Sequence, residues 1–170
     1  DMVLAPYIEF NDATGEVISE PNCNPGCEIG KVYDMADIPH MAPFMHSMTI
    51  RTACIKNRLT ITEHCFYTDT EFVLKSCNMA TNVAFFDKPI YCYRRASAGQ
   101  SMSLSGLEKH YKDQSIVVET MLDYQNSEVK REEVLAIYEE LLQNTCGWQY
   151  LVLLYISRTP EHKRDLVAFD

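Results

Sequence analysis

The chain has 170 residues, of which 46% are hydrophobic, and its formal net charge is -9 at pH 7. This length and apolar content fit a single domain with a substantial core, extended by a helical appendage. Because no run of lysine or arginine offsets the negative charge, nucleic acid and anionic membrane surfaces are poor partners. We therefore expect no nucleic acid among its partners.

The cysteine content and the lengths of the apolar runs indicate in which cellular compartment the protein is found. Seven cysteines at irregular spacing favour reduced thiols in an intracellular protein over a disulfide framework. The longest apolar run, from Tyr150 to Ile156, is far shorter than the roughly 20 residues that span a bilayer. We expect a cytoplasmic protein, with membrane association only through residues outside this chain. Since Asp1 leads directly into an apolar segment, the chain is expected to begin within a longer protein.

The first part of the chain predicts short strands and then a long loop. Apolar runs at 2–10 and 16–18 flank the turn-rich segment 11–15, a pattern typical of a hairpin. We expect the first strand to lie at a sheet edge or in this hairpin. Residues 20–43 combine prolines and glycines with little periodicity, which indicates an irregular connection.

Two helices are predicted next. Three- and four-residue spacing of apolar positions predicts a helix over 48–59, with Ser47 as its N-cap. Thr68 and Glu71 then match a capping box, which would open a second helix that runs through Cys77.

β-rich residues follow this helix. The segments 83–86 and 90–93 predict two extended stretches separated by the turn 87–89. Because side chains alternate along a strand, Tyr91 and Tyr93 are expected to share one face.

The last third of the chain predicts helices. Ser105 and Glu108 match another capping box, opening a helix that ends near Gln125. A further helix is expected to start near Ser127 and to break or kink at Gly147. The apolar C-terminal helices are expected to contact another domain or subunit.

The motifs Y-T-D-T-E-F, P-I-Y-C-Y-R and G-Q-S follow one another between Tyr67 and Ser103, with an apolar strand after the first. Together they resemble the acceptor half of bacterial family-two glycosyltransferases, which are inverting GT-A enzymes using nucleotide-diphosphate sugars. The resemblance covers residues 1–125 and leaves 126–170 as a helical extension. It implies a mixed α/β fold, similar to the second half of the GT-A fold, with several helices on a small sheet.

The resemblance also implies site residues. In that family the aspartate of a helix-opening acidic pair is the catalytic base, and the match carries this role to Asp69. The strand end and the polar loop resemble the segment that closes over the sugar nucleotide. The substrate-binding residues implied are Tyr93, Arg94, Gln100 and Ser101. Inverting transfer needs such a base to take the proton of the acceptor hydroxyl as it attacks the anomeric carbon.

The family holds a metal-bound diphosphate with a D-x-D motif, which does not occur in this chain. The resemblance therefore implies that the donor-binding part, with its Mg²⁺ or Mn²⁺, lies outside the chain. The complete protein would take a nucleotide-sugar donor and a glycan or lipid-linked acceptor, and this piece alone would be inactive. The alternative is a non-catalytic scaffold or protein-interaction module derived from the same fold.

The candidate residues also have structural interpretations. Asp69 suits a first helical turn because the helix dipole favours a carboxylate there, so a base role requires burial or a close acceptor. Glu71 is expected to complete the capping box. Arg94 either contacts phosphate or pairs with an acidic neighbour. Gln100 and Ser101 either contact substrate or only lead into the next helix.

Two further patterns are weaker. His64 and Cys65 could form a nucleophile pair, although neighbours in sequence rarely face each other productively. A loosely spaced cysteine pair with two nearby histidines could bind zinc, because thiolates and imidazoles are its usual ligands. These residues are Cys23, Cys27, His40 and His46.

Overall fold

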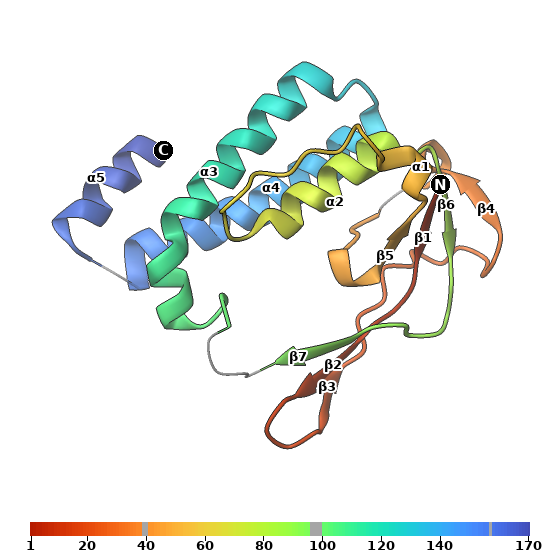
Figure 1. Cartoon of the computed structure of the whole chain (residues 1–170), viewed down its shortest axis with the longest axis horizontal. Coiled ribbons are helices and arrows are strands. Elements are labelled where there is room, and N and C mark those ends of the chain that lie inside the picture. Colours follow the sequence, from red (N-terminus) through yellow and green to blue (C-terminus); the bar gives the residue numbers. More distant parts are fainter. Residues whose placement is uncertain (39–40, 96–99, 157) are drawn as a thin grey trace.

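The computed structural model describes residues 1–38, 41–95, 100–156 and 158–170 and has a mixed α/β fold (Figure 1). Helices α2, α3 and α4 pack against one another, and two small sheets lie beside them. Figure 1 shows the smaller sheet projecting away from the helices at the bottom of the view. The expected mixed α/β fold with several helices is confirmed, but the strands form two small sheets instead of one.

The larger sheet has four strands in the order β4, β6, β1, β5. Strand β1 runs parallel to β6 and antiparallel to β5, so it is an internal strand. The prediction of an edge position for the first strand is therefore wrong for β1. The strands are β1 (Met2–Leu4), β4 (Val32–Asp34), β5 (Met48–Ile50) and β6 (Asn82–Phe85).

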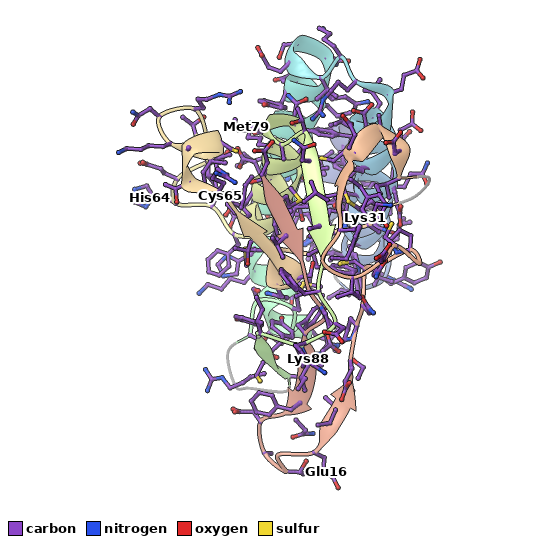
Figure 2. All side chains as sticks on the ribbon, turned by 90° about the vertical axis from the view of Figure 1, so that its right-hand side faces the viewer. Glu16, Lys31, His64, Cys65, Met79 and Lys88 are labelled. Carbon is purple, nitrogen blue, oxygen red and sulfur yellow. The ribbon has the colours of Figure 1, made fainter. Side chains whose placement is uncertain are left out.

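The smaller sheet has three strands in the order β3, β2, β7. The predicted hairpin is confirmed, since β2 pairs antiparallel with β3, and Figure 2 shows Glu16 at its outer end. Strand β7 lies parallel to β2, so the two extended segments expected around 87–89 enter different sheets. These strands are β2 (Ile8–Asn11), β3 (Val17–Ser19) and β7 (Cys92–Arg95).

The helix predicted over 48–59 is largely wrong. Strand β5 occupies its first three positions because they pair with β1, and α1 (Thr52–Ile55) forms only one turn. Ser47 is not the N-cap of such a helix; it ends the short 3-10 helix η2 (Met45–Ser47), where its hydroxyl accepts from the amide of Phe44 at 3.1 Å and donates to the carbonyl of Phe44 at 2.8 Å. Long-range pairing outweighs the local helical spacing here.

Helix α2 (Thr68–Met79) is present as predicted, but without the predicted capping box. Its N-cap is Tyr67, which has a left-handed backbone with φ of 65° and no side-chain cap. Glu71 does not reach back to the helix start because its carboxylate is buried and bonded to Lys75 and to the amide of Thr62.

The boundaries of the later helices differ from those predicted. Ser103 rather than Ser105 caps α3 (Leu104–Glu128), accepting from the amide of Gly106 at 3.1 Å. Helix α4 (Glu132–Leu151) begins after the expected position and continues through Gly147. A single glycine in an exposed helix costs only about 1 kcal/mol, which the packing of α4 outweighs. The chain ends in η3 (Val152–Ile156) and α5 (Pro160–Phe169).

One hydrophobic core joins the four-stranded sheet to α2, α3 and α4. Phe85 from β6, Leu74 from α2 and Tyr138 from α4 are fully buried in it. A second, smaller cluster gathers Leu107 and Val152 where α3 meets η3. Because α4 shares the main core, the helical extension packs against the preceding part of the chain; the division at residue 125 stays a prediction.

All seven cysteines carry free thiols. Among the described residues, no helix combines the length and the hydrophobicity needed to cross a membrane.

Arg131 links the end of α2 to the start of α4. Its Nη2 atom donates to three carbonyl oxygens at the end of α2, those of Cys77, Asn78 and Ala80, at 2.8, 3.2 and 2.7 Å. Replacing Arg131 with Met should lower the free energy of unfolding by about 2 kcal/mol, because these acceptors lose a charged donor. Urea unfolding measures this change in the free energy of unfolding. The exposed neighbour Lys130, replaced by Met, is the control, and equal stability of both variants would contradict the role of Arg131.

Candidate functional site

A surface hollow of about 410 Å³ lies where the start of α2 meets β7 and the lead-in to α3. Its lining comes from four segments of the described chain: 45–46, 65–69, 93 and 101–102. The volume falls within the range of roughly 300 to 1,000 Å³ that small-molecule sites have. We treat this hollow as the candidate site because it gathers polar and aromatic groups that are far apart in the sequence.

Three of the five site residues proposed from the sequence, Asp69, Tyr93 and Ser101, line this hollow. Arg94 and Gln100 are not among its lining residues. Since successive side chains of a strand point to opposite faces, Arg94 is directed away from Tyr93. Its Nη1 atom lies 3.7 Å from a carboxylate oxygen of Asp12, while Gln100 donates to the carbonyl of Arg94.

Asp69 lies in the first turn of α2 and is exposed. Its neighbour two positions later, Glu71, is buried, because a step of two residues rotates by about 200° around a helix. The two carboxylates therefore face different surroundings, as expected from their spacing. Only Asp69 is available to a molecule in the hollow.

His46 connects the hollow to the smaller sheet. Its ring stacks against Tyr93 and Tyr91, with centroids 4.4 and 5.1 Å away, and meets the edge of Tyr7 at 5.5 Å. The prediction that Tyr91 and Tyr93 share a face is confirmed by these contacts. Burial lowers the pKa of His46, while the negative charges of Asp69 and Glu9 oppose this shift. The imidazole is therefore predominantly neutral at pH 7.

Tyr67 shapes the wall between α2 and the lead-in to α3. Its hydroxyl donates to the carbonyl of Ser101 at 3.0 Å, and burial, followed by the charges of Asp113 and Asp69, raises its pKa. A left-handed backbone is uncommon for an aromatic residue and costs of the order of 1 to 3 kcal/mol. Such strain two residues before Asp69 is typical of a backbone held in place by its surroundings.

A buried ion pair holds the segment before α2 against that helix. Lys75 bonds to Glu71 one turn earlier and donates to the carbonyl of Thr60 at 2.9 Å. The second carboxylate oxygen of Glu71 accepts from the amide of Thr62 at 3.1 Å. This network fixes the chain that leads to Phe66 and Tyr67 in the wall of the hollow.

The opposite wall requires a glycine in α3. A Cβ atom at Gly106 would lie 2.5 Å from the carbonyl oxygen of Ser101 and 2.7 Å from that of Gln100. Because these contacts are with backbone atoms, a side chain at this position would force the backbone of 100–101 to move away. The close approach of 100–101 to α3 therefore depends on this glycine. Sequence reasoning did not identify Gly106 as a determinant of the site.

The geometry disfavours His64 and Cys65 as a nucleophile pair. Figure 2 labels both on one flank of the molecule, where His64 is exposed. Cys65 Sγ donates to the carbonyl oxygens of Phe66 and Asp113 at 3.4 and 3.5 Å. Burial, then the charges of Asp113 and Glu71, raise the pKa of Cys65, which favours the unreactive thiol.

The described residues contain no group of three or more His, Cys, Asp or Glu side chains that could hold a metal ion. Of the four zinc candidates, His40 lies outside the described residues, and His46 is stacked among tyrosines. Cys23 and Cys27 pack against the main core instead.

A larger, open hollow of about 760 Å³ lies beside the later turns of α2 and α3. Lys75 and Arg131 line it, but both are already engaged in the contacts described above. It contains none of the proposed site residues.

Sequence reasoning missed His46 as a site residue and considered it only as a zinc ligand. No local pattern marks it, because its place in the hollow depends on the distant strand β7. Phe66 was missed as well; it stacks on His110 with ring centroids 3.7 Å apart.

No protein-family model matches this chain, and no curated protein sequence matches it.

The buried pair of Glu71 and Lys75 is expected to stabilise the fold jointly. Glu71→Gln or Lys75→Met alone should lower the free energy of unfolding by about 3 kcal/mol, because each leaves an unpaired buried charge. The double variant should lose less than the sum of the two. Urea unfolding of all three tests this, with Lys112→Met of the exposed Lys112–Glu161 pair as the control that changes stability far less. Additive losses would contradict coupling.

Burial of His46 predicts a pH dependence of stability. Because its pKa in the folded protein lies below the ordinary value of 6.5, the unfolded chain binds this proton first as the pH falls. The contribution of neutral His46 is present above that value and is lost on acidification towards the folded-state pKa. His46→Phe should flatten the fall in unfolding free energy between about pH 7 and 5, whereas His64→Asn at an exposed site should not. An unchanged slope for His46→Phe would contradict the prediction.

Proposed function

We propose that this chain is the acceptor-side part of an inverting glycosyltransferase and that Asp69 is its general base. The observation that carries the proposal is the hollow itself, where Asp69, Tyr93 and Ser101 come together from three separate segments. The finer likeness to the second half of the GT-A fold belongs to this proposal.

The chemistry of the hollow supports the assignment. An acceptor hydroxyl in the hollow would donate a hydrogen bond to the Asp69 carboxylate, which takes its proton as the oxygen attacks the anomeric carbon of the donor sugar. The bond from that carbon to the donor's diphosphate oxygen breaks at the same time, and the nucleoside diphosphate leaves with its electron pair. Tyr93 and the backbone at Ser101 would orient the acceptor ring. Arg94 takes no part in this step, because its guanidinium lies near Asp12.

The donor side belongs to the complete protein. The nucleotide-diphosphate sugar and the divalent metal, Mg²⁺ or Mn²⁺, would be bound outside this chain, because the D-x-D motif that holds them in the resembling family does not occur in it. The acceptor would be a glycan or a lipid-linked sugar of a bacterial polysaccharide, and the enzyme would work in the cytoplasm.

Replacing Asp69 with Asn in the natural full-length protein tests the proposal. Turnover with a nucleotide sugar should fall by about 10²- to 10⁴-fold, because the amide cannot take the acceptor proton. Glu132→Gln, an exposed carboxylate in the first turn of α4, is the matched control and should retain turnover. Thermal unfolding of both variants checks the fold. Full turnover by the Asp69→Asn protein would overturn the base assignment.

A second candidate is a non-catalytic scaffold or interaction module. The observation that favours it is a set of large apolar side chains exposed near the end of α4 and in η3, which would contact another domain or subunit. They are Trp148, Leu154 and Tyr155, with 46%, 43% and 66% of their surfaces exposed. A full-length protein that transfers no sugar with native Asp69, yet forms a stable complex in analytical ultracentrifugation, would favour this candidate.

A further inference from the structure

The charge of the candidate hollow restricts what it can bind. Among the described residues that line it, Asp69 is the only acidic one, and none is lysine or arginine. The residues outside the described ranges, 39–40, 96–99 and 157, include no lysine, arginine, aspartate or glutamate in the sequence. The hollow therefore has one negative charge in its lining and no cation there to balance it.

His46 does not supply the missing positive charge. Its pKa is lowered by burial, and the opposing charges of Asp69 and Glu9 do not reverse that shift. The guanidinium of Arg95 lies 5.9 Å from the ring centroid of Tyr93. However, Arg95 Nη1 is 3.6 Å from a carboxylate oxygen of Glu9, which largely offsets its charge.

The remaining lining suits a ring with one apolar face and a polar edge. Met45, Phe66 and Met102 are exposed by 40%, 45% and 45%, so their apolar surfaces are available to C–H groups. Tyr93 and Asp69 offer hydrogen-bonding groups in the same space. A pyranose presents both kinds of surface, since its axial C–H groups form a patch and its hydroxyls surround the ring.

We infer that the hollow binds a neutral pyranose as the acceptor and discriminates against sugars that carry a carboxylate. This inference rests on the proposed function, because it names the acceptor class of the same site. A uronic acid would bring its negative charge beside Asp69 with no lysine or arginine in the described lining to compensate. Neutral hydroxyls would instead donate hydrogen bonds to that carboxylate.

Matched pairs of methyl glycosides test the inference directly. Methyl β-glucopyranoside and methyl β-glucopyranosiduronic acid differ only in whether C6 carries a hydroxyl or a carboxylate. The corresponding galactose and mannose pairs cover other ring stereochemistries. Titrating each compound into the isotope-labelled chain, with chemical-shift changes followed at the amides of Tyr67, Asp69 and Ser101, reports binding in the hollow without any transfer reaction.

A neutral glycoside is expected to bind about three- to tenfold more tightly than its uronic acid partner at low salt. Asp69→Asn should bring this ratio close to one, because it removes the repelling charge while retaining the shape of the side chain. Glu132→Gln is the control and should leave the ratio unchanged. Added salt should also reduce the ratio, since the hollow is open to solvent.

The outcomes separate this inference from the proposed function. Uronic acids that bind in the hollow as tightly as their neutral partners would overturn the inference and leave the transfer proposal standing. No binding of any glycoside at these amides would overturn it as well, while the turnover of full-length Asp69→Asn would still decide the base role. A ratio unaffected by Asp69→Asn would show that charge does not set the preference.

Discussion

The buried ion pair of Glu71 and Lys75 is the interaction on which the candidate site depends. Removing two charges from water is unfavourable, and their mutual attraction offsets this only when their remaining hydrogen bonds are also made. Here the carbonyl of Thr60 and the amide of Thr62 complete the network, so satisfying the pair requires the preceding loop to lie against α2. That requirement places Tyr67 and Asp69 at the edge of the hollow.

The same helix turn explains why one carboxylate is structural and the other is available. Glu71 and Asp69 differ by about 200° around α2, so burial of the first directs the second outward. The sequence pattern Thr68-x-x-Glu71 predicted a capping box, because that arrangement satisfies free amides at a helix start. The prediction failed because Lys75, one turn later, needs the same carboxylate. The pair at i and i+4 is also a local pattern, but its advantage over the capping box depends on the burial of Glu71, which the spacing does not specify.

Long-range pairing sets the limit of what the sequence predicts. The hairpin of β2 and β3 and the helix α2 were predicted because their signals are local. Strand β5 was mistaken for helix, since its pairing with β1 joins positions that are far apart in the chain. Local motifs likewise marked three residues of the hollow, Asp69, Tyr93 and Ser101. No local motif marked His46, because its place in the hollow depends on contacts with Tyr91 and Tyr93, which form only on folding.

The exposure of Asp69 is compatible with a base role only if the ligand completes the site. Water competes with an acceptor hydroxyl for the hydrogen bonds of an exposed carboxylate. A ring seated over Met45, Phe66 and Met102 would displace that water and bring a hydroxyl within hydrogen-bonding reach of Asp69. A neutral ring displaces the water without adding a charge beside Asp69, whereas a cationic ring would form an ion pair with the carboxylate. The charge of the hollow and the proposed transfer reaction therefore favour the same class of acceptor.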